Sequence, residues 1–200
     1  MEEEGKGVSR IAVFFAEGYE EIEALAVVDI CRRGGIETDM VSVSGEPEVK
    51  GAHGIAVRTD KLLEGLDFDA YDMLVLPGGK AGTEGLEACG ELMAQVDAFY
   101  AAGKYIGAIC AAPSIFGHRG ILKGRRACSY PAFESHLEGA EVTAGPVEVS
   151  DHVITSRGMG AVLPCYSREQ CFLHMIISFI FHFLLRLSVH DGLRHLPGLL

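Results

Sequence analysis

Alternating apolar and amphipathic segments define the elements that the chain is predicted to form. The run "RIAVFFA" at 10–16 is continuously apolar, as expected of a strand covered on both faces. The next segment, "YEEIEALAVVDICRRGG" at 19–35, has acids in its first turn, apolar residues at helical spacing and arginines before its glycines, which predicts a helix. Further strands are predicted at 37–45, 71–79 and 105–109, and a second helix at 90–103.

Strands that alternate with helices predict an α/β fold with a doubly wound, mostly parallel sheet sandwiched by helices. The alternating segment 145–158 carries Ser150-Asp151 between two strand-like halves, which predicts a hairpin added at an edge of the sheet. Ligands of such sheets bind beyond the carboxyl ends of the strands, where Gly18, Gly78-Gly79 and Cys110 fall. We expect these loops to converge on one crevice.

Cys110 stands at a predicted turn from strand to helix, in "AICAAPSIFG". Such a turn pushes the side chain outward and directs the following N–H groups toward it, as in a nucleophile elbow. The helix N-terminus is expected to lower the pKa of the thiol, which predicts a reactive cysteine. The alternative is a small residue needed only for packing.

Glu23 lies on an apolar helix face, because Ala26, Val27 and Ile30 follow it at helical spacing. A carboxyl group packed there is expected to have a raised pKa and to hold or pass a proton. The alternative is an exposed glutamate in the first turn.

Four motifs carry a resemblance to a known family: "AVFFAEGYEEIEALAVVDICRRGGIE", "DMLVLPGG", "AICAAPSIFG" and "VITSRGMG". In this order and spacing they resemble the DJ-1/PfpI superfamily, specifically its DJ-1/ThiJ/YajL branch, from about Ser9 to Pro164. The resemblance implies a flavodoxin-like fold, a homodimer and a domain at 1–164.

The resemblance also implies roles for single residues. Cys110 corresponds to the nucleophilic, oxidation-sensitive cysteine, and Glu23 to the glutamate that hydrogen-bonds to it. Gly79 and Ala111 correspond to the positions whose N–H groups form an oxyanion pocket, and Gly78 and Tyr130 are expected to line the pocket. Tyr130 stands where some relatives have histidine, which makes a Cys-His-acid triad doubtful. Ala111 stands where the peptidase-like branch has histidine, so proteolysis is disfavoured.

A thiol, a proton-carrying carboxyl group and an oxyanion pocket fit attack on a small carbonyl compound. We expect a cofactor-independent glyoxalase that converts methylglyoxal or glyoxal to a 2-hydroxy acid through a Cys110 hemithioacetal. Family members are also credited with deglycation, which would begin with the same adduct. The alternative is a redox sensor or holdase chaperone that stores Cys110 as sulfinate.

Composition and charge limit the classes of partner and cofactor that the protein is expected to bind. A net charge of -11 disfavours nucleic acid and anionic membranes. The N-terminus carries no signal-like apolar run, and no CxxC pair occurs, so we expect a cytoplasmic chain with reduced thiols. No dinucleotide or phosphate motif is complete, so no cofactor is expected. No metal is expected either, because the histidines, including His53, His118, His136 and His152, show no ligand spacing.

Residues 165–200 break the pattern of the preceding domain. Their net charge is +1 against -12 for residues 1–164, and twelve of the sixteen residues at 172–187 are apolar. This run is shorter than the roughly 20 residues of a membrane span, so we expect no anchor. We expect instead that the reading frame or the assembly changed near Cys165, and that this atypical tail is not the evolved C-terminus.

Overall fold

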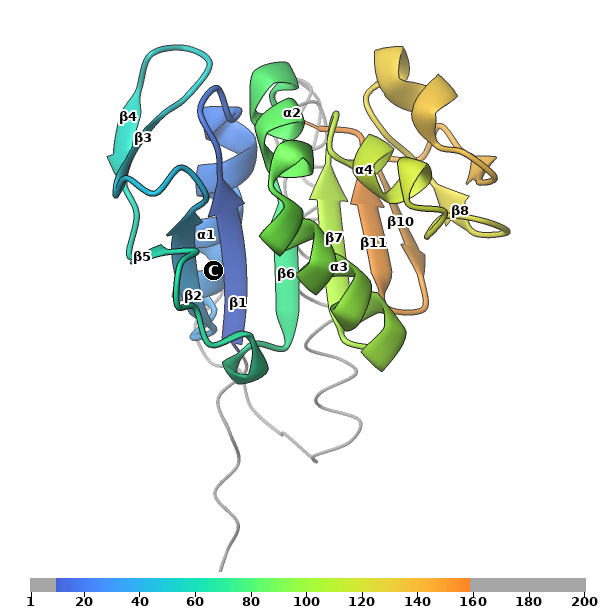
Figure 1. Ribbon diagram of the computed structural model, residues 1–200. Helices are drawn as coiled ribbons and strands as arrows, with labels where there is room; N and C mark the ends of the chain where they lie inside the picture. The colour runs from blue at the N-terminus through green and yellow to red at the C-terminus, as the bar shows by residue number, and fades with distance from the viewer. Residues whose placement is uncertain (1–9, 159–200) are drawn as a thin grey trace, which may run out of the picture.

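The computed structural model describes residues 10–158, which form one seven-stranded sheet with helices on both faces (Figure 1). The strands run in the order β10-β11-β7-β6-β1-β2-β5, and all neighbours are parallel except β10 and β11. The sheet strands are β1 (Arg10–Phe15), β2 (Glu37–Ser42), β5 (Lys61–Leu62), β6 (Met73–Leu76), β7 (Tyr105–Ile109), β10 (Val147–Ser150) and β11 (Val153–Ser156). The predicted α/β class and the mostly parallel sheet are confirmed.

Four α-helices and two 3-10 helices connect the strands of the described part. They are α1 (Glu21–Arg33), η1 (Phe68–Ala70), α2 (Lys80–Ala88), α3 (Gly90–Ala102), α4 (Pro113–His118) and η2 (Pro131–His136). In Figure 1, α1 lies behind the sheet, whereas α2, α3 and α4 lie in front of it. Both long helices predicted from periodicity, α1 and α3, are present.

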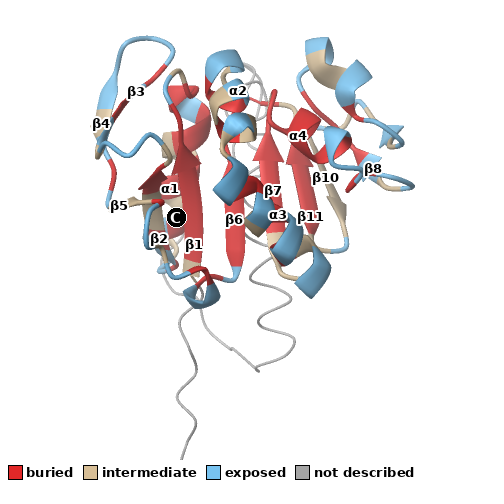
Figure 2. Cartoon of the chain, in the orientation of Figure 1, coloured by how far each residue is buried: buried red, intermediate tan, exposed pale blue. Residues whose placement is uncertain are grey.

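Alternate residues of the central strands pack into two separate cores. Phe14 of β1 points into the core beneath α2, α3 and α4, where its ring stacks on Phe68 at a centroid distance of 6.2 Å. Val13 and Phe15 point to the opposite side and pack against Val27 of α1. Burial on both faces explains the unbroken apolar run of β1, and Figure 2 shows the central strands as the most buried elements.

The predicted edge hairpin is confirmed, and two small sheets were not predicted. Strands β10 and β11 are antiparallel and turn at Asp151, whose φ is 58°. The unpredicted pairs are β3 (Glu48–Lys50) with β4 (Ala56–Arg58), and β8 (Arg126–Ala127) with β9 (Glu141–Val142). The loop of the β3–β4 connection lies against the start of α1, where the N–H of His53 donates to Oε1 of Glu21.

In the part of the chain that the structure describes, no helix has the length and apolar character that crossing a membrane demands. The expectations for the tail at 165–200, and for a domain ending at 164, concern residues outside the described range.

Candidate active site

Cys110 follows β7 at the carboxyl end of the sheet, and its backbone is held from two sides. Its N–H donates to the carbonyl oxygen of Ser156 at 2.8 Å, and its own carbonyl oxygen accepts from the N–H of Tyr130 at 2.8 Å. The φ of Cys110 is 62°, in the left-handed region that few residues other than glycine adopt. The predicted sharp turn is therefore present, and neighbouring strands and loops maintain its backbone strain.

Glu23 of α1 lies on the same side of the sheet, because Cys110 packs against the core that α1 covers. Glu23 is only 1% exposed, as its position on the apolar face of the helix predicted. Glu20 is the N-cap of α1, and its Oε2 atom accepts a 2.9 Å hydrogen bond from the N–H of Glu23. The N–H of Glu20 in turn donates to the carbonyl oxygen of Gly78 at 2.9 Å. These bonds tie the first turn of α1 to the loop after β6.

The surroundings of the Cys110 thiol favour its protonated form while Glu23 is ionised. Burial, followed by the charge and hydrogen bonding of Glu23, raises the pKa of Cys110 to about 12, although the N–H groups of Ala111 and Gly79 oppose this. The predicted lowering of the thiol pKa is therefore wrong. Its physical reason is that α4 begins only at Pro113 and has six residues, so its dipole contributes less than burial and the carboxylate.

Two glycines enclose the Cys110–Glu23 pair. A Cβ atom at Gly78 would overlap Glu23 Oε2 and lie 2.6 Å from the Cβ of Cys110. A Cβ atom at Gly158 would lie 2.8 Å from Glu23 Oε1 and 3.3 Å from Cys110 Sγ. Real side chains do not approach this closely, so both positions require glycine for the carboxyl group and the thiol to meet.

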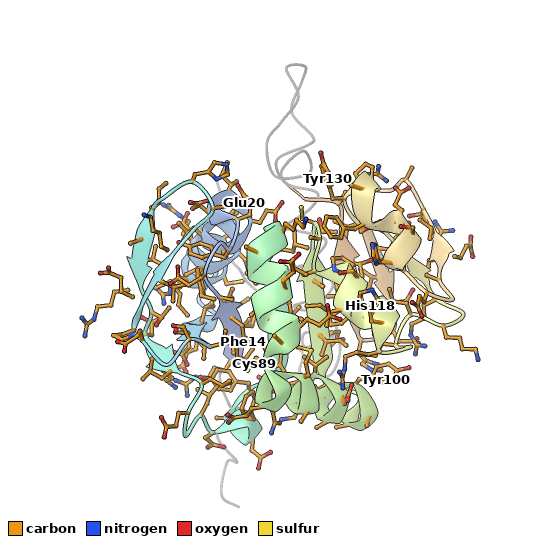
Figure 3. The ribbon with its side chains drawn as sticks, turned by 45° about the horizontal axis from the view of Figure 1, so that its top comes forward. Phe14, Glu20, Cys89, Tyr100, His118 and Tyr130 are labelled. Carbon is orange, nitrogen blue, oxygen red and sulfur yellow. The ribbon has the colours of Figure 1, made fainter. Side chains whose placement is uncertain are left out.

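Gly79 and Tyr130 border the pair in different ways. Gly79 has a φ of 89°, and a Cβ atom there would lie 2.7 Å from the nitrogen of Glu20. Tyr130 contacts Cys110 through its backbone, and the residue is 52% exposed. Figure 3 shows Glu20 and Tyr130 at the same end of the sheet, on opposite sides of the top of α2. The loops after β1, β6 and β7 thus converge as expected from their sequence positions.

The structure brings together the residues singled out from the sequence, namely Cys110, Glu23, Gly78, Gly79 and Ala111. Their catalytic and oxyanion roles remain predictions. The contact of Gly158 with the pair was not predicted, although the motif "VITSRGMG" contains it. The capping role of Glu20 was missed as well, because acidic residues in a first turn are common.

Histidines with no ligand spacing in the sequence nevertheless meet acidic groups in the fold. The Nδ1 atom of His53 lies 2.8 Å from Oε2 of Glu21, a hydrogen bond that raises the pKa of His53. Burial would raise the pKa of Glu21, but hydrogen bonds from His53 lower it. His118 contacts Glu87 at 2.7 Å and His136 at 3.1 Å. Sequence spacing could not reveal these contacts.

The sequence as a whole matches a known family. The model of the DJ-1/PfpI family matches residues 9–166. The chain belongs to the DJ-1/PfpI family, and the expected flavodoxin-like fold is confirmed.

Individual relatives extend this assignment. The chain is 35% identical over 156 residues to "Protein DJ-1 homolog B" of Arabidopsis thaliana, a match that covers 77% of this chain and 36% of that protein. It is 34% identical over 145 residues to "Glutathione-independent glyoxalase DJR-1.2" of Caenorhabditis elegans, covering 72% and 77% respectively. The structure titled "Toxoplasma gondii DJ-1, oxidized" is similar with a TM-score of 0.77 at 28% identity, covering 94% of this chain and 100% of that one. The chain thus spans less than half the length of the Arabidopsis relative.

Proposed function

We propose that the protein is a cofactor-independent glyoxalase that converts small 2-oxoaldehydes, such as methylglyoxal and glyoxal, to 2-hydroxy acids. The observation that carries this proposal is the enclosed contact between the Cys110 thiol and the Glu23 carboxyl group, beside the N–H groups of Gly79 and Ala111. A nucleophile, a proton carrier and two oxyanion donors are the groups that this reaction requires. The relative in Caenorhabditis elegans named as a glyoxalase supports the same reaction class.

Cys110 and Glu23 carry one negative charge between them at neutral pH in this proposal. Ionising the thiol beside an ionised Glu23 is costly, which is why the pKa of Cys110 is raised to about 12. When the shared proton sits on Glu23, that repulsion disappears, and the carboxyl group and both N–H groups can donate to the sulfur. The thiolate formed in this way is the attacking nucleophile.

The reaction begins with addition to the aldehyde. The Cys110 sulfur forms a bond to the aldehyde carbon, and the carbonyl π electrons move to the oxygen. The N–H groups of Gly79 and Ala111 stabilise the developing oxyanion, which in other enzymes is worth about 3 to 4 kcal/mol per donor. The proton on Glu23 then passes to this oxygen and completes the hemithioacetal.

Isomerisation and hydrolysis follow on the same carbon atoms. The Glu23 carboxylate removes the proton from the carbon that carries sulfur and returns it to the adjacent carbon, while the hydroxyl proton moves to the neighbouring oxygen. The product is a 2-hydroxyacyl thioester of Cys110. Water hydrolyses it: the C–S bond breaks, hydroxide adds to the carbonyl carbon and the remaining proton restores the thiol.

Turnover without added thiol tests this function. Methylglyoxal is incubated with the wild type, Cys110→Ala and Glu23→Gln, and lactate is followed by proton NMR. We expect lactate from the wild type and from Cys89→Ala, which changes a cysteine outside the site, but none from Cys110→Ala or Glu23→Gln. Lactate formation by Cys110→Ala at the wild-type rate would exclude the mechanism. Deglycation is followed in a separate assay with a methylglyoxal-modified thiol, since that reaction reaches the same Cys110 adduct.

A second candidate function is redox sensing or holdase activity through oxidised Cys110. The same thiol is accessible enough to react, and Glu23 and the two N–H groups could hydrogen-bond to a sulfinate. The oxidised state named for the Toxoplasma gondii relative favours keeping this candidate. Peroxide-dependent protection of a denaturing client protein, without lactate formation, would support the sensor over the enzyme.

We propose in addition that the protein acts as a cytoplasmic homodimer. The family assignment supports the dimer, which sedimentation of the full chain would test. A single monomeric species at micromolar concentration would contradict it.

A further inference from the structure

Three potential metal ligands meet away from the Cys110 thiol, where the β3–β4 loop contacts the start of α1. They are Glu20 and Glu21 of the helix start and His53 of the loop, whose ligand atoms all lie within 4.8 Å of one another. The Nδ1 atom of His53 is 2.8 Å from Oε2 of Glu21 and 3.9 Å from Oε1 of Glu20. One imidazole nitrogen therefore faces oxygens of two different carboxylates.

The loop that carries His53 is held against the helix by its backbone. The N–H of His53 donates to Oε1 of Glu21 at 2.7 Å, and the N–H of Ala52 donates to the carbonyl oxygen of Tyr19 at 2.8 Å. These two hydrogen bonds fix the backbone of His53 and so limit the positions that its ring can take. Preorganised ligands lose less conformational entropy when they bind an ion.

The two carboxylates are buried, but the site is open on one side. Glu20 is 7% exposed and Glu21 is 4% exposed, whereas the side chain of His53 is 68% exposed. Among residues 10–158, no lysine or arginine forms an ion pair with either carboxylate. Adjacent buried carboxylates attract a cation. Backbone N–H groups, including that of His53, offset part of the charge of Glu21, and the His53 ring supplies at most one positive charge.

One oxygen of this cluster faces the imidazole without a hydrogen bond to it. Oε2 of Glu20 is occupied by the N–H of Glu23, but Oε1 faces His53 at 3.9 Å, which is too long for a hydrogen bond. This acceptor belongs to a residue that is more than nine-tenths buried, and it is directed toward the imidazole. The 3.9 Å between Glu20 Oε1 and His53 Nδ1 suits two ligands of one ion better than a hydrogen-bonded pair.

We propose that Glu20, Glu21 and His53 form a binding site for a divalent transition-metal ion of the zinc type. Zinc binds imidazole nitrogen and carboxylate oxygen at about 2.0 to 2.2 Å, so two of its tetrahedral ligand atoms lie about 3.4 Å apart. The two separations from His53 Nδ1, 2.8 and 3.9 Å, bracket this value, and all three ligand atoms lie within 4.8 Å of one another. The ion replaces the proton between His53 and Glu21, and water on the open side completes the coordination. Mixed nitrogen and oxygen ligands favour zinc over calcium or magnesium.

The site is separate from the proposed glyoxalase chemistry, since neither Cys110 nor Glu23 is a ligand. Its effect is structural: an ion bound by helix and loop joins the β3–β4 hairpin to α1. Because the ion binds the folded protein, it raises the unfolding temperature.

The test measures zinc binding by calorimetry in the full chain with Cys110→Ser, which removes a competing thiol. The chain also has histidines and cysteines beyond residue 158, so the informative quantity is a difference between variants. Adding His53→Ala should remove one equivalent of bound zinc and abolish the zinc-induced rise in unfolding temperature. Adding Glu20→Gln, which keeps an acceptor for the helix cap, should weaken binding by about tenfold or more.

His118→Ala is the matched control, because His118 also contacts a glutamate, Glu87, at 2.7 Å. Its other contact is His136, and within residues 10–158 it has no second carboxylate in ion-pair range. This variant should bind as much zinc as its Cys110→Ser parent. Circular dichroism establishes that each variant is folded. The proposed site would be refuted if the folded His53→Ala variant bound zinc with the same stoichiometry and affinity as its parent. It would also be refuted if His118→Ala lost as much zinc binding as His53→Ala.

Discussion

The Oε2 atom of Glu20 accepts a 2.9 Å hydrogen bond from the N–H of Glu23, so the N-cap of α1 holds the residue that faces Cys110. Capping and site geometry are therefore coupled in one turn of helix. A cap normally satisfies a free N–H group and so stabilises the helix. Here it also determines where the carboxyl group of Glu23 can reach.

Glu20→Ala should lower the free energy of unfolding by about 1 kcal/mol, the usual cost of losing a cap. Glu20→Gln should lower the free energy of unfolding much less, because its amide oxygen can still accept a hydrogen bond from the N–H of Glu23. Urea denaturation of both variants measures the difference. Identical midpoints for the two variants would show that the hydrogen bond contributes nothing to stability.

Gly78→Ala should abolish methylglyoxal turnover, because its Cβ atom would overlap Glu23 Oε2 and displace the carboxyl group from Cys110. Gly90→Ala is the matched control: neither glycine has a positive φ, and a Cβ atom at Gly90 meets nothing within 4 Å. Lactate production by the two folded variants is compared with that of the wild type. Full turnover in Gly78→Ala would mean that the close packing around the pair is not required.

The fold was more predictable than the surroundings of the site. Continuous apolar runs predict β1, β6 and β7 because burial on both faces leaves no polar alternation, and helical periodicity predicts α1 and α3. The short strands β3 and β4 carry too few residues for either pattern to develop. Their loop, which brings His53 to Glu21, was therefore not predicted.

The electrostatics of Cys110 depend on long-range contacts and could not be predicted from its turn alone. The sequence places the thiol before a helix, which suggests a lowered pKa. The pKa of Cys110 is raised instead by burial and by Glu23, which is far away in the sequence and approaches from another element. Likewise, Gly158 meets Cys110 and Glu23 only because β11 is parallel to β7 and ends beside it.

The pH dependence of alkylation should reveal whether Cys110 and Glu23 share one proton. In the proposed shared-proton state, the pair carries one negative charge from neutral pH upward, and the last proton leaves only near the raised Cys110 pKa of about 12. Iodoacetamide should therefore react with Cys110 at a rate that is nearly constant between about pH 7 and pH 10. Glu23→Gln leaves one titrating group, so its rate should rise about tenfold per pH unit below the thiol pKa.

Peptide mapping by mass spectrometry assigns this reaction to individual cysteines. Cys110 should be labelled ahead of Cys31 and Cys128, because those two thiols are fully buried, whereas Cys110 is partly exposed and shares its proton with Glu23 in the proposed mechanism. A wild-type rate that rises as steeply with pH as that of Glu23→Gln would contradict the shared proton. Faster labelling of Cys31 or Cys128 would contradict the assignment of Cys110 as the reactive thiol.

Asp39 should contribute to stability at neutral pH and lose that contribution in acid. Burial would raise its pKa, but hydrogen bonds from Tyr71 at 2.7 Å and Lys61, with the charges of Lys61 and Arg10, lower it. A carboxyl group with a lowered folded-state pKa stabilises the fold above its unfolded pKa of about 3.9, and this stabilisation is lost as the pH falls through the folded value.

Asp39→Asn should therefore be less stable than the wild type at pH 7, and the gap should narrow toward about pH 3. Asp29→Asn is the control, because Asp29 pairs with Arg33 on the surface with its side chain 59% exposed, and such pairs contribute little. Urea midpoints at both pH values measure the two gaps. A gap for Asp39→Asn that stays constant with pH would show that the charge of Asp39 is not what stabilises the fold, and would leave the hydrogen bond from Tyr71 as the cause.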